Sequence, residues 1–130
     1  MKILQILALL LVCSIDGPQA LADEPTGAQL FMTHCASCHG AETEGGGPVA
    51  GVMAIAVPNL RTLAMRNRGV FPADAVAAYI DGRDQRPAHG SRTMPVWGDF
   101  LQAEGAPDAE LSVRLRIAAL VAFIERQQYH

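Results

Sequence analysis

One short stretch of the chain combines residue types and spacing that define a specific chemistry, Cys35-Ala36-Ser37-Cys38-His39. Two thiols on one turn of helix can reach the two vinyl groups at one edge of a porphyrin and form thioether bonds with them. The imidazole that follows is then presented to the iron. A redox CxxC pair or a zinc-binding pair does not need this histidine. The pattern therefore predicts one covalent haem c, with Cys35 and Cys38 as attachment residues and His39 as a ligand of its iron.

A second candidate iron ligand, Met94, lies in Thr93-Met94-Pro95-Val96-Trp97-Gly98. Pro95 fixes the backbone beside the methionine, Trp97 can form a wall of a haem pocket, and Gly98 allows a close approach to the ring. We therefore predict Met94 as the distal ligand. Two alternatives stay open, namely that His89 takes this position or that the iron keeps an open site.

The remaining methionines and histidines are weaker candidates for the iron. Met53 and Met65 are interpreted as core fillers, and Met32 precedes the cysteines in the first expected helix. His34 directly precedes Cys35, but a block of four neighbouring residues is too compact to surround one tetrahedral zinc ion. We expect His34 to be packed or exposed rather than a metal ligand.

The N-terminus has the pattern of an export signal. Lys2 is followed by a mostly apolar run over residues 3–15, and Ala20-Leu21-Ala22 supplies a small-x-small cleavage site. We predict a secretory signal peptide over residues 1–22, a mature domain over residues 23–130 and a periplasmic location. The alternative is an uncleaved membrane anchor, but the apolar run is shorter than the ~20 residues that a spanning helix needs.

The composition of the mature part limits the possible classes of function. After Ala22 the chain has nine arginines, twelve acidic residues and no lysine, which gives a formal charge of −3. It has no basic patch suited to nucleic acid. A domain of this size is marginal for a protein-only core, and a covalent haem would supply a large apolar plate around which short helices pack.

The periodicity of the chain predicts an all-α domain. Thr26 and Gln29 form the pattern of a capping box, so the first helix is expected to begin there and to carry the cysteines at its C-terminal end. A second helix is predicted from Pro72 to about Asp81, stopped by Gly82. The glycines over residues 45–47 are interpreted as a flexible surface turn.

The last helix is predicted to begin near Asp108, which is favourable at the positive end of the helix dipole. Its apolar residues cover a wide surface, which suits a helix with more than one neighbour. The expected main buried face consists of Leu111, Leu115, Ala118, Ala119, Ala122 and Phe123, and the residues that widen it are Val113, Ile117, Leu120 and Ile124.

Taken together, the capped first helix with CxxCH, the loop methionine and the long last helix resemble class I c-type cytochromes. The resemblance implies a small cytochrome c fold, in which three to five short helices wrap around one covalent haem. In that family the first and last helices cross closely. Gly27 and Phe31 match the positions on the first helix, with Leu120 and Phe123 as the expected partners on the last.

The resemblance also implies roles for residues around the haem. Family members carry the distal methionine in an M-P-x-W/F-G loop, which Met94 and Trp97 match. A loop proline often supplies the carbonyl that accepts a hydrogen bond from the proximal histidine, and Pro58 is the matching candidate. The candidates for contacts with the haem propionates are Arg61, Tyr79, Arg83, Arg92 and Trp97.

The function expected from these features is one-electron transfer in the periplasm by a protein that is not an enzyme. Its partners would be other redox proteins, among them a membrane oxidase, reductase or dehydrogenase. Two alternatives remain at this stage. The chain could be the haem subunit of a dehydrogenase or terminal reductase complex, or a haem enzyme or gas-binding protein with an open or labile distal site.

Overall fold

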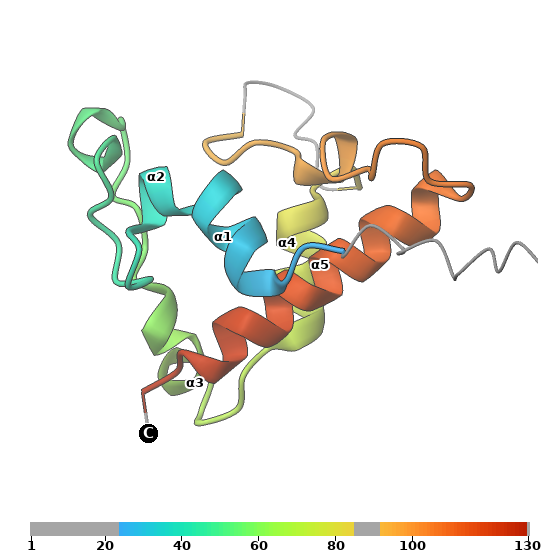
Figure 1. Cartoon of the computed structure of the whole chain (residues 1–130). Coiled ribbons are helices and arrows are strands. Elements are labelled where there is room, and N and C mark those ends of the chain that lie inside the picture. The colour runs from blue at the N-terminus through green and yellow to red at the C-terminus, as the bar shows by residue number, and fades with distance from the viewer. Residues whose placement is uncertain (1–23, 85–91, 130) are drawn as a thin grey trace, which may run out of the picture.

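The computed structural model describes residues 24–84 and 92–129, and these form an all-α domain without a β-strand (Figure 1). The predicted fold class is therefore confirmed. The predicted signal peptide and His89 lie outside the described residues. The helices are α1 (Gly27–His34), α2 (Ala36–His39), α3 (Leu63–Arg66), α4 (Ala73–Asp81) and α5 (Ala109–Arg126), and the 3₁₀ turns are η1 (Ala50–Val52), η2 (Leu60–Thr62) and η3 (Trp97–Asp99).

Helix α1 begins at the predicted capping box. The amide of Thr26 donates to Oε1 of Gln29 at 2.8 Å, and the amide of Gln29 donates to Oγ1 of Thr26 at 3.3 Å. The helix does not continue through the cysteines as expected, because it ends at His34 and α2 starts anew at Ala36. The hydroxyl of Thr33 donates to the carbonyl of Gln29 at 2.9 Å just before this break. Such back-bonding bends helices, and sequence periodicity does not reveal it.

Helices α1 and α5 cross in close contact, as the resemblance implied. A Cβ atom on Gly27 would clash with the carbonyl oxygen of Ala119 and lie 3.0 Å from Cβ of Phe123. The rings of Phe31 and Phe123 pack with their centroids 5.1 Å apart. The two helices therefore meet at two contacts, Gly27 against the backbone of Ala119 and the ring of Phe31 against that of Phe123. Leu120 of α5 is fully buried.

Helix α4 has the predicted bounds to within one residue. Pro72 precedes its first turn, and Gly82 ends it in the left-handed conformation with φ 69°. Helix α5 begins after Asp108, whose Oδ1 accepts a hydrogen bond from the amide of Leu111 at 2.9 Å. Figure 1 shows α5 running through the length of the domain, with α1 and α4 lying against it.

The predicted main face of α5 is only partly correct, because Ala119 and Phe123 pack against the core whereas Leu111 and Leu115 do not. Leu111 is 45% exposed and Leu115 is 60% exposed. The fully buried residues of α5 include all four that were predicted to widen this face, and the complete set is Ser112, Val113, Ile117, Leu120, Val121 and Ile124. Both sides of α5 carry aliphatic residues at helical spacing, so periodicity alone could not distinguish the side that α1 and α4 cover.

The glycine-rich segment after the cysteines is not the free surface turn that was predicted. The amide of Gly47 donates to the carbonyl of Cys38 at 3.0 Å, and a Cβ atom on Gly47 would lie 2.5 Å from the carbonyl oxygens of Ala36 and Ser37. Of the three glycines at 45–47, only Gly46 has open space around it. The segment folds back on α2 and bonds its C-terminal carbonyl groups, which an isolated helix end would leave unpaired.

Candidate haem site

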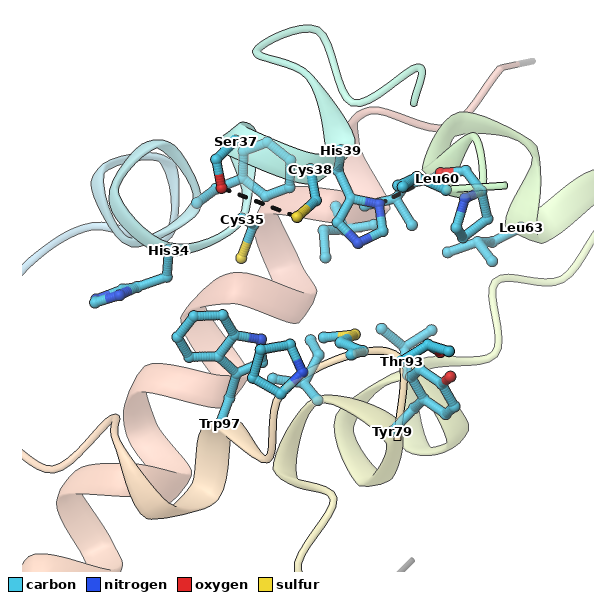
Figure 2. Close-up of a pocket in the computed structure, with 18 of the residues that line it drawn as sticks. His34, Cys35, Ser37, Cys38, His39, Leu60, Leu63, Tyr79, Thr93 and Trp97 are labelled. Carbon is cyan, nitrogen blue, oxygen red and sulfur yellow. Dashed lines mark hydrogen bonds between the residues drawn. The ribbon is translucent and has the colours of Figure 1, made fainter. Parts of the chain in front are cut away.

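A cavity of about 520 Å³ lies among α1, α2, α4 and the segment that precedes η3. Its lining is predominantly apolar, and its size is in the range of cofactor pockets. Figure 2 shows Cys35, Cys38 and His39 on one side of the cavity. Thr93 and Trp97 lie on the other side, and Met94 between them in sequence also lines the cavity.

The two thiols on the first wall are both free, and Cys35 is buried. Burial, and to a smaller extent the neighbouring Cys38, raises the pKa of Cys35 to about 12. A redox-active CxxC pair has a thiol with a lowered pKa, so this environment does not fit disulfide exchange. No cluster of three or more His, Cys, Asp or Glu side chains within residues 24–84 and 92–129 could hold a metal ion by itself.

The imidazole of His39 is oriented by the protein. Its Nδ1 donates to the carbonyl oxygen of Pro58 at 3.3 Å, which is the contact that the resemblance implied. Burial lowers the pKa of His39, and the hydrogen bond to Pro58 opposes part of this effect. A neutral ring that carries its proton on Nδ1 leaves the lone pair of Nε2 for a metal.

The opposite wall is held by contacts of Trp97 and Gly98. The ring of Trp97 lies 5.4 Å from that of His34 and 6.3 Å from that of Phe100, between centroids. A Cβ atom on Gly98 would clash with the carboxylate of Asp81 and lie 2.5 Å from Nε of Arg83. A glycine is therefore required where the segment that carries Met94 passes the end of α4.

Six predicted residues line this one cavity, namely Cys35, Cys38, His39, Pro58, Met94 and Trp97. The candidates for propionate contacts divide into two groups. Tyr79 and Trp97 line the cavity, whereas Arg61, Arg83 and Arg92 do not.

The three arginines outside the lining have other partners. Arg61 pairs with Glu44, and Arg83 pairs with Asp81 and Glu110. Arg92 donates to the carbonyl of Tyr79 at 2.6 Å.

Two of the basic residues that line the cavity were not predicted to do so. Arg66 lines the cavity and donates to the carbonyl of Asn59 at 2.9 Å. His34 lines the cavity against Trp97, which is the packed one of the two states expected for it. Nothing in the sequence indicated that Arg66 on α3 would line the cavity.

The residues present fit a covalent haem. The apolar lining suits a porphyrin, two unpaired thiols lie on the same wall as an oriented imidazole, and a thioether lines the cavity as well. This combination, in a domain whose described residues form five α-helices, defines a small helical protein of the c-type haem class.

Comparisons with known proteins identify the family. The model of the family described as Cytochrome c matches residues 25–127. A protein named cytochrome c6 from Synechococcus sp. (strain ATCC 27167 / PCC 6312) is 35% identical over 94 residues, which are 69% of this chain and 77% of that protein. No solved structure is significantly similar. The chain belongs to the cytochrome c family as a class I c-type cytochrome, an electron-transfer protein with one covalent haem c.

Proposed function

We propose that this cytochrome is a periplasmic one-electron carrier whose haem iron is bound by His39 and Met94. The observation that carries the proposal is one apolar cavity that has Cys35, Cys38 and His39 on one wall and the Met94 segment across from them. A planar group attached to the two thiols would have the imidazole of His39 and the thioether of Met94 available in the same cavity.

The chemistry divides between the cofactor and the chain. When bound, the haem supplies an iron that takes up and releases one electron. His39, oriented by Pro58, provides a nitrogen donor of fixed direction. Met94 provides a neutral sulfur donor, and this sulfur, together with the apolar lining, favours the reduced iron. No general acid or base is required for this reaction.

The location and partners belong to the same proposal. Residues 1–22 are proposed to direct export, and residues 23–130 to form the carrier. Ile55 lines the cavity and is 49% exposed, and Val52, three residues earlier in the chain, is 86% exposed. An apolar rim of this kind suits brief docking with other redox proteins, such as a membrane oxidase, reductase or dehydrogenase. No helix in the described part of the chain has the length and apolarity needed to cross a membrane.

The first test is the optical spectrum of the haem-loaded protein, oxidised and reduced, with and without carbon monoxide. A low-spin spectrum with the weak far-red band of methionine on ferric iron, unchanged by the gas, supports ligation by His39 and Met94. A high-spin spectrum that shifts with carbon monoxide means an open distal site. That result would replace the carrier by a gas-binding protein or a haem enzyme.

A further inference from the structure

A buried glutamine at the end of α5 is bonded to the segment that carries Pro58. Gln128 is 7% exposed. Its Nε2 donates to the carbonyls of Leu60 at 2.8 Å and Ile124 at 2.9 Å, and its Oε1 accepts from the amide of Ala64 at 2.8 Å. One side chain thus joins α5 to η2 and α3 through three hydrogen bonds.

These bonds continue toward His39. Leu60 is two residues after Pro58, and its amide donates to the carbonyl of Thr43 at 2.9 Å, so Leu60 is held at both its amide and its carbonyl. The amide of Gly45 donates to the carbonyl of His39 at 2.8 Å. The loop after His39 is therefore bonded at Thr43 to Leu60, the same residue that Gln128 holds.

The next residue strengthens the same attachment. The amide of Tyr129 donates to the carbonyl of Arg61 at 2.9 Å, and its hydroxyl donates to Oε1 of Glu44 at 2.8 Å. Arg61 pairs with the same carboxylate oxygen at 3.1 Å and lies 4.3 Å above the Tyr129 ring. We call Gln128, Tyr129, Arg61 and Glu44 the C-terminal clamp.

We propose that Gln128 is a positioning residue for the proximal ligand, because it holds Pro58 at hydrogen-bonding distance from His39. The inference rests on the proposed function in one respect, that His39 binds the iron. The distance from Nδ1 to the Pro58 oxygen is 3.3 Å, beyond the usual range for such bonds. A small outward movement of Pro58 would therefore break the bond. Because this bond makes the imidazole a stronger donor, its loss favours the reduced iron.

The test is Gln128→Met in the haem-loaded protein, a change that keeps the size of the side chain and removes all three hydrogen bonds. We expect a higher reduction potential, with the equilibrium constant for reduction raised up to tenfold, which is ~59 mV for one electron. We also expect faster solvent exchange of the His39 Nδ1 proton, measured by NMR on the reduced protein.

Ser112→Ala is the matched control. Ser112 is also buried on α5, accepts a hydrogen bond from the amide of Ala103 at 2.9 Å, and does not line the cavity. The Ser112→Ala variant should have a lower free energy of unfolding and an unchanged reduction potential and His39 Nδ1 proton exchange. If Gln128→Met changes the potential and the exchange no more than Ser112→Ala does, Gln128 is a structural residue only and the proposal is overturned.

A second variant covers the case in which Gln128→Met does not fold. Tyr129→Phe removes only the hydroxyl bond to Glu44 and should shift both quantities in the same direction by a smaller amount. With Gln128→Met unfolded, no shift in Tyr129→Phe rejects the proposal. If Met94 does not bind the iron, the wild-type protein will bind carbon monoxide, which identifies that failure separately. Exchange of the His39 Nδ1 proton would still show whether the C-terminal clamp positions Pro58.

Discussion

At the scale of single residues, the two proposed iron ligands are held in different ways. His39 is on helix α2 and has a hydrogen-bond partner for its ring in Pro58. Met94 is on an irregular segment whose course depends on Pro95 and on the packing of Gly98 against Asp81. The proximal side is therefore fixed by hydrogen bonds and the distal side by backbone packing. We expect the distal ligand to be the more easily displaced.

Replacing Met94 by alanine tests the distal assignment. Met94→Ala should lower the reduction potential, because thioether ligation favours the reduced iron, and should make the reduced protein bind carbon monoxide. Redox titration and the optical spectrum under the gas measure the two effects. Met65→Ala is the control, since Met65 is 63% exposed and does not line the cavity. An unchanged potential in Met94→Ala would move the assignment to His89.

The residues of the site differ in how far the sequence reveals them. Cys35, Cys38 and His39 are contiguous, so their joint chemistry can be identified without knowledge of the fold. Pro58 was assigned only by resemblance to a family, whereas Met94 was assigned from its neighbours Pro95, Trp97 and Gly98 as well as by that resemblance. Gln128 had no signal, because its partners at Leu60 and Ala64 are far away in sequence and a glutamine near a chain end has no characteristic spacing.

At the scale of elements, the crossing of α1 and α5 supports one end of the haem cavity. Phe31 and Ile124 line the cavity from these two helices. Gly27 lets the helices approach, because no side chain separates it from the backbone of Ala119. The geometry of the crossing thus determines the shape of the cavity on this side.

Gly27→Ala should therefore destabilise the protein. The added Cβ clashes with a backbone carbonyl that cannot rotate away, and overpacking of this kind costs roughly 1–3 kcal/mol. Denaturant unfolding of the haem-loaded protein measures the change. Gly51→Ala is the control, because nothing lies within 4 Å of the added atom, and it should change the stability by less than about 0.5 kcal/mol. Equal stabilities of the two variants would show that the helices separate at no cost.

The elements were predicted better at their ends than on their faces. Thr26 and Asp108 begin helices and Gly82 ends one as expected, because a cap acts through bonds to nearby backbone groups. The centre of the buried face of α5 was misplaced, with Leu111 and Leu115 exposed, because burial depends on neighbours that come from distant parts of the chain. The break at Cys35 was missed for a different reason, because both flanking turns are helical and the bond from the Thr33 hydroxyl to Gln29 leaves no mark in the periodicity.

At the scale of the whole molecule, the haem cavity is a large part of the interior. A cavity of about 520 Å³ in a domain of this size borders several residues of the hydrophobic core, among them Leu60, Ile80 and Ile124. Without its occupant these side chains would lose their packing partners. The stability of the domain therefore depends on the attachment of the haem.

The double variant Cys35→Ala/Cys38→Ala should bind haem only weakly and fold poorly. Far-UV circular dichroism should show reduced helix content, and the cooperative unfolding transition should be lost. Ser37→Ala is the control, because it changes the same turn and leaves both cysteines in place. A double variant with normal helix content and cooperative unfolding would contradict a haem-centred core.

Acid should weaken an ion cluster that joins α4 to α5. The Arg83 guanidinium hydrogen-bonds to Asp81 and Glu110 and lowers the pKa of both carboxyl groups below 3.8 and 4.5, their ordinary values. A depressed pKa in the folded state adds stability that is complete above the unfolded value and disappears as the pH falls through the folded one. We therefore expect the free energy of unfolding to decrease below about pH 4.5.

Arg83→Gln should make this decrease shallower, because the two carboxyl groups would then titrate nearer their ordinary values. Unfolding free energies measured from pH 6 down to pH 3 would show it. Arg126→Gln is the control, since Arg126 forms no ion pair with another described residue. An identical acid dependence in wild type and Arg83→Gln would mean that other groups govern acid unfolding.

The division of the site between one contiguous turn and a distant segment determines the order in which the protein can mature. Cys35, Cys38 and His39 need only a local turn to come together, so haem can be joined to a chain that is not yet folded. Met94 is 55 residues after His39, and it reaches the cavity only once a long loop has closed, at an entropic cost. Binding of the Met94 sulfur to the iron would thus be the last step of assembly, and the time at which the far-red band appears would report when folding is complete.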